Sequence, residues 1–136
     1  MTLKLADDRM CYVCGKDNPH GFRLAFKHPE HNRLTAEVVF SKHHQGFQDI
    51  VHGGMVSMLL DEMMVNLAWV ENTPAVTAEL TVRLKKPVKV GERVFLEGRI
   101  DGREGSRVLR ASASAKNAQG ALLATAKGTC IRIPAR

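Results

Sequence analysis

The feature that most constrains this chain is the run VHGGMVSMLLDEMMVNLAWV, from Val51 to Val70. It predicts a helix over about Gly53 to Val70, with apolar side chains around nearly its whole circumference. A helix that is apolar all round must be buried on most of its sides. Two acids, Asp61 and Glu62, nevertheless lie in its middle. The rest of the chain must therefore enclose this helix, and the two acids call for an explanation.

A membrane span is a poor interpretation of the same run. A spanning helix needs about 20 predominantly apolar residues and tolerates central charges badly. The first residues, MTLKLADDRM, contain no apolar run long enough for a signal peptide. We therefore expect a cytoplasmic protein that does not bind membranes. With 136 residues, the chain is long enough for one domain with its own core, and we expect that domain to cover residues 1–136.

The remaining segments indicate strands and turns. Residues 1–21 predict a short helix or coil and a tight turn, because CGKDNPHG is rich in turn formers. Before the helix, FRLAFKH and RLTAEVVF predict two strands joined by PEHN. After it, turn signals at PVKVGE, DGREG and NAQG separate four strands: AVTAELTVRLKK, RVFLEGRI, SRVLRASASAK and ALLATAKGTCIRI. The economical arrangement is an α+β fold in which a curved antiparallel sheet of five to six strands wraps one long helix.

Two of these strands have informative faces. The strand after the helix alternates, so one face would carry Val76, Ala78, Leu80, Val82 and Leu84. The opposite face of that strand would carry Thr77, Glu79, Thr81, Arg83 and Lys85. In the last strand one face is made mostly of small residues, namely Leu122, Ala124, Ala126, Gly128 and Cys130. Small residues suit the close approach of a helix or of a second sheet.

The charge of the chain suggests an anionic partner. The formal net charge is +6, and basic residues cluster in VRLKKPVKVGER and RIDGREGSRVLR. Aromatic residues make up only 5% and no known nucleic-acid motif is present, so we do not expect nucleic acid to be that partner. A phosphorylated small molecule is the better candidate. The plain alternative is a soluble basic protein.

The three cysteines do not indicate a disulfide framework, because their number is odd and no signal peptide is recognised. Cys130 lies in an apolar run and is expected in the core. Cys11 and Cys14 form a C-x-x-C motif, which can be half of a zinc site. Histidines that could complete it are His20, His28 and His31. Their spacing does not match that of standard zinc fingers, and a redox pair would need a thioredoxin-like context. We therefore expect a structured turn without a metal.

Three segments, in order along the chain, resemble a known family. CYVCGKDNPHGFRLAF resembles the N-terminal C-x-x-C-G-x-x-N-P-x-G-L-x-L pattern of one subgroup of hotdog-fold acyl-CoA thioesterases. HHQGFQDIVHGGMVSMLLDEMM resembles the loop and helix start of that subgroup, and AVTAELTVRLKKPVKVGE resembles its next strand. These are thioesterases of the phenylacetate-pathway type, similar to 4-hydroxybenzoyl-CoA thioesterases. The resemblance covers nearly the whole chain.

The resemblance implies a hotdog fold and hydrolysis of a small-to-medium acyl or aryl thioester of CoA, without a cofactor. It also implies a homodimer whose sheets join edge to edge, or a dimer of dimers. Each active site would lie at the dimer interface, with the helix N-terminus from one subunit and the helical acid from the other. Two alternatives stay open: an acyl-CoA-binding protein without catalysis, and a hotdog hydratase or dehydratase.

Thioester hydrolysis needs a group that polarises the carbonyl and a base or nucleophile. A helix N-terminus offers the first through its free N–H groups, and the resemblance assigns this role to Gly53, then Gly54. The alternative is that the glycines only allow close packing. Asp61, nine residues after His52, is at the family's usual position for the catalytic carboxylate, as base or nucleophile. The alternative is a buried acid held by Ser57.

Other residues near the site have candidate roles as well. Thr77 is where relatives place a Ser or Thr near the catalytic water, although a solvent-facing threonine is the alternative. His52 is expected to structure the turn beside the site. Glu62 is a structural neighbour or a second candidate for the base. Gly46 is a departure, because relatives often carry Asn or Gln there. Gln45, Gln48 and Asp49 are near enough in sequence to substitute.

Substrate binding would use apolar and basic side chains. Methionines line adaptable apolar pockets, and Arg or Lys at the pocket mouth would hold the phosphates of CoA. The expected substrate-binding residues are Gln48, Val51, Met55, Met58, Arg83, Lys85 and Lys86.

Overall fold

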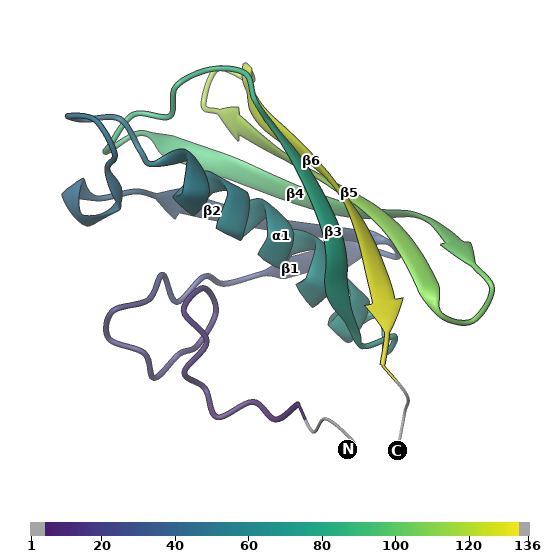
Figure 1. Ribbon diagram of the computed structural model, residues 1–136. Helices are drawn as coiled ribbons and strands as arrows, with labels where there is room; N and C mark the ends of the chain where they lie inside the picture. Colours follow the sequence, from purple (N-terminus) through teal and green to yellow (C-terminus); the bar gives the residue numbers. More distant parts are fainter. Residues whose placement is uncertain (1–4, 134–136) are drawn as a thin grey trace.

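The helix α1, Gly53–Val70, lies along the inner face of one curved antiparallel sheet in the computed structural model, which describes residues 5–133 (Figure 1). Its bounds are those that the sequence predicts. The strands are β1 (Lys27–Glu30), β2 (Arg33–Val39), β3 (Ala75–Leu84), β4 (Arg93–Glu104), β5 (Val108–Asn117) and β6 (Leu122–Arg132). This is the expected α+β fold of one long helix wrapped by a sheet, and the sheet has six strands.

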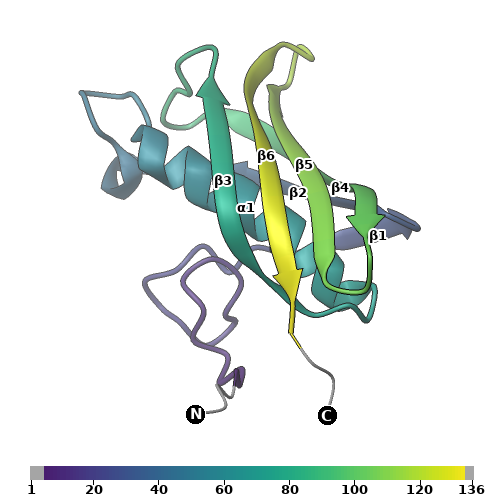
Figure 2. The same cartoon turned by 45° about the vertical axis from the view of Figure 1, so that its right-hand side comes forward.

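The strand that follows the helix lies at an edge of the sheet. The spatial order is β1-β2-β4-β5-β6-β3, so β3 pairs with the last strand of the chain and has a neighbour on one side only. Figure 2 shows β3 beside β6, with α1 behind them. Because β3 also contacts α1, the central helix lies next to this edge of the sheet.

The first expected strand is shorter than its sequence suggests. FRLAFKH was expected to be extended, but only Lys27–Glu30 forms β1. Arg23 has a positive φ of 49°, and Leu24 N–H donates to Val13 O at 2.9 Å. The chain around Leu24 therefore hydrogen-bonds to residues near Val13 and not to β2. Residues 5–26 together are called the N-terminal segment below. The turn is also tighter than PEHN, because Asn32 takes the left-handed conformation at its end.

The expected turn DGREG is only partly a turn. β4 continues to Glu104 and pairs it with Val108, so the turn occupies residues 105–107. The register between the two strands shifts between Ile100 and Gly102. The Arg110 guanidinium donates to Glu104 Oε1 at 2.7 Å across the end of this hairpin.

A bulge in β3 changes the meaning of its alternation. The register with β6 shifts between Thr77 and Glu79. Ala75 is fully buried and Thr77 half-buried, whereas Val76 and Leu80 are 38% and 36% exposed. The bulge thus divides the strand, and the predicted apolar face of β3 does not enter the core of this chain as a whole.

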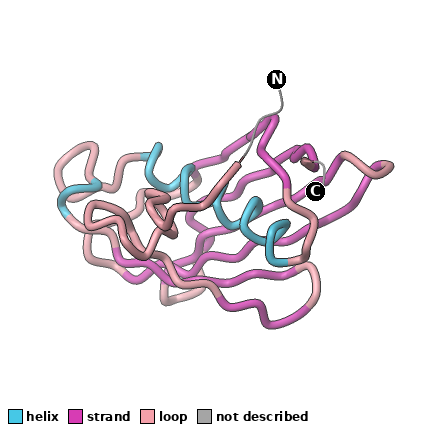
Figure 3. The backbone as a smooth tube through the Cα atoms, turned by 90° about the horizontal axis from the view of Figure 1, so that it is seen from below, coloured by secondary structure: helices cyan, strands magenta, loops and turns pink. Residues whose placement is uncertain are grey.

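The helix is enclosed from two sides. The sheet covers one side, and the N-terminal segment runs across the other (Figures 1 and 3). The fully covered helix residues are Val56, Leu59, Leu60, Met63, Met64, Leu67 and Ala68. Asp61, Glu62 and Asn66 are half-buried, and Trp69 and Val70 are exposed at the C-terminal end. Within residues 5–133, no helix combines the length and apolar character needed to cross a membrane.

Contact between helix and sheet depends on a glycine in β4. A Cβ added at Gly98 would lie 2.5 Å from the backbone oxygen of Met63, so no side chain fits between β4 and α1. In β6, a Cβ at Gly128 would lie 3.1 Å from the end of the Met64 side chain, which is flexible. The helix therefore approaches β6 closely, as its small residues suggested. It approaches β4 more closely still, at Gly98.

The Gly98→Ala variant should therefore be destabilised by about 1–3 kcal/mol, because the helix backbone must shift to admit the methyl group. Urea unfolding followed by circular dichroism measures the change. Gly102→Ala is the matched control on the same strand, since a Cβ there meets no atom within 4 Å. Equal stability of the two variants would contradict this account of the packing.

Candidate active site

The two most informative polar side chains meet where α1 faces β3. Thr77 Oγ1 donates a hydrogen bond of 2.6 Å to Asp61 Oδ1, and both residues are half-buried. A hydroxyl bonded to a carboxylate at this distance is a strong, charge-assisted contact. Within the described chain Asp61 has no other hydrogen-bond donor, so its Oδ2 keeps its lone pairs. Thr77 is not a solvent-facing threonine.

Ser57 does not hold Asp61. Its hydroxyl donates to the Gly53 carbonyl at 2.8 Å, one turn back along the helix. The orientation of Asp61 therefore depends on a residue of the sheet and not on its own helix.

Cys130 is a neighbour of this pair that sequence reasoning placed in the core without linking it to the site. It is fully buried, as expected, and lies opposite Thr77 in the β3–β6 register. Burial, and then the negative charge of Asp61, raise the pKa of the Cys130 thiol, while its contact with Thr77 acts in the other direction. The thiol therefore stays protonated at neutral pH. No sequence signal could have revealed this position, because it follows from strand register.

The start of α1 presents a backbone donor. His52 is the N-cap, and its Nδ1 accepts from Gly54 N–H at 2.8 Å. The Gly54 donor is thus already used. Gly53 N–H makes no backbone hydrogen bond outside the helix in residues 5–133, and the first residue of a helix has no partner within it. Gly53 N–H is therefore the available donor at the positive end of the helix dipole.

A cavity of about 400 Å³ lies at the helix start, and Gly53 is one of its lining residues. Among the residues that were expected at the site, it is lined by Val51, His52, Gly53, Lys85 and Lys86. Sequence reasoning did not single out its other lining residues, which are Phe47, Ile50, Val56, Leu84, Pro87 and Val88. Gly46, where relatives often carry Asn or Gln, also lines it. The cavity therefore joins the helix start, the preceding loop and the end of β3.

The remaining expected binding residues lie outside this cavity. Met55 and Met58 are partly buried and pack against the main core. Gln48 and Arg83 are exposed, on the loop and on β3 respectively. Gln45 stabilises the loop itself, because its side-chain oxygen accepts from Asp49 N–H at 3.0 Å.

The helix start and Asp61 are too far apart to act on one atom. Eight residues of α-helix separate Gly53 from Asp61, which amounts to about 12 Å along the axis. A carbonyl polarised by the first and attacked by the second must lie within about 3–3.5 Å of both. Each chain therefore carries two separate halves of such a site.

Glu62 faces a different environment from Asp61. It contacts Cys11 and accepts from Asn66 Nδ2 at 3.4 Å. Burial first, and then the charge of Glu62, raise the pKa of Cys14 beside it. Two of the three histidines considered as ligands for the cysteines pair with another residue: His28 Nε2 is 2.6 Å from Glu71 Oε2, and His31 contacts the same carboxylate.

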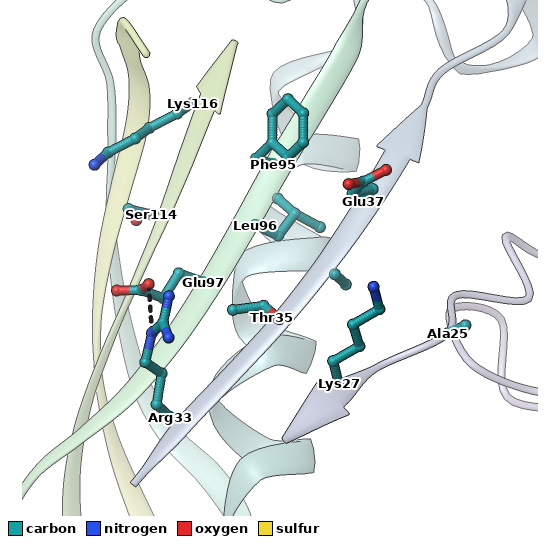
Figure 4. Close-up of a pocket in the computed structure, with 11 residues that line it drawn as sticks. Ala25, Lys27, Arg33, Thr35, Glu37, Phe95, Leu96, Glu97, Ser114 and Lys116 are labelled. Atoms are coloured by element: carbon teal, nitrogen blue, oxygen red, sulfur yellow. Dashed lines mark hydrogen bonds and ion pairs between the residues drawn. The ribbon is translucent and has the colours of Figure 1, made fainter. Parts of the chain in front are cut away.

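A larger cavity, about 480 Å³, lies on the outer face of the sheet, away from α1 (Figure 4). Its lining comes mainly from β2, β4 and β5, and the Arg33–Glu97 ion pair of 2.9 Å crosses it. Neither Asp61 nor Gly53 lines it. The smaller cavity at the helix start is therefore the better candidate for substrate binding.

A model of the Thioesterase superfamily matches residues 48–124, which include α1, β3 and the Asp61–Thr77 pair. The chain belongs to the thioesterase superfamily. No curated protein gave a significant match.

Solved structures show the same hotdog fold. A thioesterase superfamily protein superimposes with a TM-score of 0.85 at 22% identity, over 90% of this chain; this chain spans 60% of its length. The E. coli PaaI protein, from the phenylacetic acid degradation operon, gives 0.77 at 14% identity, over 83% of this chain and 81% of its own.

A hypothetical thioesterase protein from Streptococcus pneumoniae, solved with coenzyme A, gives a TM-score of 0.77 at 13% identity, over 83% of this chain and 88% of its own. The same protein has been solved as two alanine variants, one of an aspartate and one of a threonine.

Replacing His52 tests the geometry of the helix start. His52→Ala should lower the free energy of unfolding by about 1 kcal/mol, because Gly54 N–H loses its capping acceptor. His52→Asn restores a side-chain acceptor at the N-cap and should recover most of that loss. Thermal or urea unfolding measures both, and equal losses in the two variants would argue against a capping role.

Proposed function

We propose that this protein hydrolyses acyl-CoA thioesters with a small-to-medium acyl or aryl group, using Asp61 as nucleophile or general base. The observation that carries the proposal is the 2.6 Å hydrogen bond from Thr77 to Asp61, a half-buried acid on a largely apolar helix. A half-buried carboxylate is costly to keep in such a place without a function. Membership of the thioesterase superfamily supports the same chemistry.

The Streptococcus pneumoniae variants support the choice of this pair. The aspartate and threonine replaced there are separated by the same number of positions as Asp61 and Thr77. This equal spacing supports the choice of Asp61 and Thr77 as the pair to test.

Either role of Asp61 gives a balanced reaction. As nucleophile, a carboxylate oxygen bonds to the acyl carbon, the C–S bond breaks, and CoA leaves as the thiolate; water then hydrolyses the anhydride. As base, the carboxylate takes a proton from water, which attacks the same carbon, and that proton passes to the departing sulfur. In both, Gly53 N–H stabilises the oxyanion, and Thr77 keeps one carboxylate oxygen in place.

The active site requires two copies of the chain. Gly53 and Asp61 of one chain are separated by about 12 Å, so the partner must supply one of them. β3 is an edge strand next to Asp61, with exposed Val76 and Leu80 along it. An uncovered apolar edge strand favours pairing with another strand. Two β3 strands related by a two-fold axis would join the sheets and complete two equivalent sites. A dimer of dimers is compatible with the same pairing.

The cavity at the helix start suits an acyl-CoA. Its volume of about 400 Å³ falls in the range typical of small-molecule sites. Lys85 and Lys86 line it and can pair with the phosphates of CoA. Arg83 lies two residues before Lys85, near the end of β3. The coenzyme A bound to the Streptococcus pneumoniae structure supports this ligand class. The cytoplasmic location stays a prediction from the sequence.

One observation favours a second candidate, an acyl-CoA-binding protein without turnover. Gly46 lines the cavity where relatives often carry an amide side chain, and the exposed Gln48 does not line it. Tight binding of acyl-CoA by the wild type without thiol release from any member of a substrate panel would favour this candidate.

Removing the carboxylate tests the catalytic role. Asp61→Ala and the shape-matched Asp61→Asn should lower thiol release from a panel of aromatic, short-chain and long-chain acyl-CoAs by at least about 100-fold, because neither can attack or accept a proton. Thiol release is followed with a chromogenic disulfide. Asp101→Asn, an exposed acid on β4, is the control and should keep its rate. Unchanged turnover in Asp61→Ala would remove Asp61 from the mechanism.

Mixing two inactive variants tests the shared site. Gly53→Pro removes the N–H at a helix position that proline tolerates, while Gly53→Ala adds the same Cβ and keeps the donor. Gly53→Pro should be inactive, and Gly53→Ala should retain activity. Co-expressed Gly53→Pro and Asp61→Ala chains should recover about a quarter of the wild-type rate, since about half of the dimers are mixed and each has one intact site.

No recovery in dimers shown by mass spectrometry to be mixed would mean that Gly53 and Asp61 do not act in a shared site. If light scattering showed the wild-type protein to be a monomer, and that monomer were fully active, the dimer itself would be excluded.

A further inference from the structure

Two thiols and a carboxylate converge where the N-terminal segment crosses α1. The Sγ atoms of Cys11 and Cys14 and a carboxylate oxygen of Glu62 lie within 4.8 Å of one another, and all three residues are half-buried. Both carboxylate oxygens of Glu62 are 4.0 Å from Cys11 Sγ. Cys11 and Glu62 are 51 residues apart in the chain, so the tertiary fold creates this cluster.

The C-x-x-C-G turn directs both thiols to the same side. Cys14 N–H donates to Cys11 Sγ at 3.5 Å, and Gly15 N–H donates to Cys11 O at 2.9 Å. A Cβ on Gly15 would lie 2.4 Å from the Cys11 nitrogen, so only glycine allows the turn to close so tightly. The turn thus preorganises two sulfur atoms before any ligand arrives.

The cluster has no cationic side chain to balance it. In the part of the chain that the structure describes, Glu62 forms no ion pair; its contacts are Cys11 and the Asn66 amide. This distinguishes it from Glu71 near the end of the same helix, which is paired with His28 and His31. A half-buried carboxylate that faces two thiols lacks a positive partner, and a bound cation would supply one.

We propose that Cys11, Cys14 and Glu62 bind a zinc ion. Thiolates and carboxylates are both zinc ligands, and thiolates select zinc over magnesium or calcium. Around a tetrahedral ion with Zn–S near 2.3 Å and Zn–O near 2.1 Å, ligand atoms are spaced by roughly 3.6–3.8 Å. The present separations reach that spacing through shifts of about 1 Å or less, and water supplies the fourth ligand. Binding of the ion displaces the thiol protons.

Asn66 would support the site from outside. Its Nδ2 lies 3.9 Å from Cys14 Sγ and 3.4 Å from Glu62 Oε1. Hydrogen bonds of this kind orient metal ligands and are typical of the outer layer of metal sites. The amide therefore contacts one sulfur ligand and the carboxylate ligand at once.

The zinc ion would fasten the N-terminal segment to α1. Glu62 would then be a metal ligand and not a second candidate for the base, even though it is adjacent to Asp61. The inference does not depend on thioester hydrolysis, because its test measures the amount of bound metal and not the enzyme activity.

The full-length protein, purified and exchanged into buffer with zinc and a reducing agent, should retain about one zinc per chain by mass spectrometry of the metal. Replacing zinc with Co²⁺ should produce thiolate-to-cobalt charge-transfer absorption and the visible bands of a tetrahedral ion. Cys14→Ser and Glu62→Gln should lose the tightly bound metal, and Asn66→Ala should bind it about 10–100-fold more weakly. Cys130→Ala, which removes a thiol outside the cluster, should keep it.

The spectrum of the cobalt-loaded wild type does not depend on whether any variant folds. Wild-type protein with no metal above the level of a chelator-washed sample would overturn the proposal. So would metal retained in folded Cys14→Ser, or a Cys11–Cys14 disulfide found by mass spectrometry in protein isolated with its thiols blocked.

Discussion

The enclosure of α1 is the constraint on which the rest of this structure depends. Its apolar residues need cover on nearly every side, and the sheet alone covers only one. The helix comes so close to β4 that Gly98 has no room for a side chain. The N-terminal segment then covers the other side. The two acids of the helix consequently face different covers.

This division gives the two adjacent acids separate environments. Successive residues on a helix point about 100° apart, so Asp61 and Glu62 cannot share one neighbour. Asp61 faces β3, where a threonine hydroxyl orients it. Glu62 faces the N-terminal segment, where two thiols lie near it. The reaction that we propose and the metal site that we infer thus use two different faces of one helical turn.

Several features could be predicted from the sequence because they depend on local chemistry. The apolar run and its His-Gly-Gly start were sufficient for the bounds of α1. The turns around the last strands follow from Gly, Asn and Asp. The start of β1 was missed because Leu24 hydrogen-bonds to Val13 in another segment and not to β2. The extension of β4 was missed because cross-strand pairing of Glu104 with Val108 overrides the turn signal of DGREG. Local propensity carries no information about such partners.

The candidate site divides in the same way. The sequence by itself determined that an enclosed helix would carry a free backbone donor at its start and two acids on different faces, because both follow from helical geometry. Only the tertiary structure decided that Thr77 turns inward to Asp61, since that requires the bulge in β3 and its register with β6. It also decided that Glu62 meets Cys11 and Cys14, since the path of the N-terminal segment is set by packing between residues far apart in the chain.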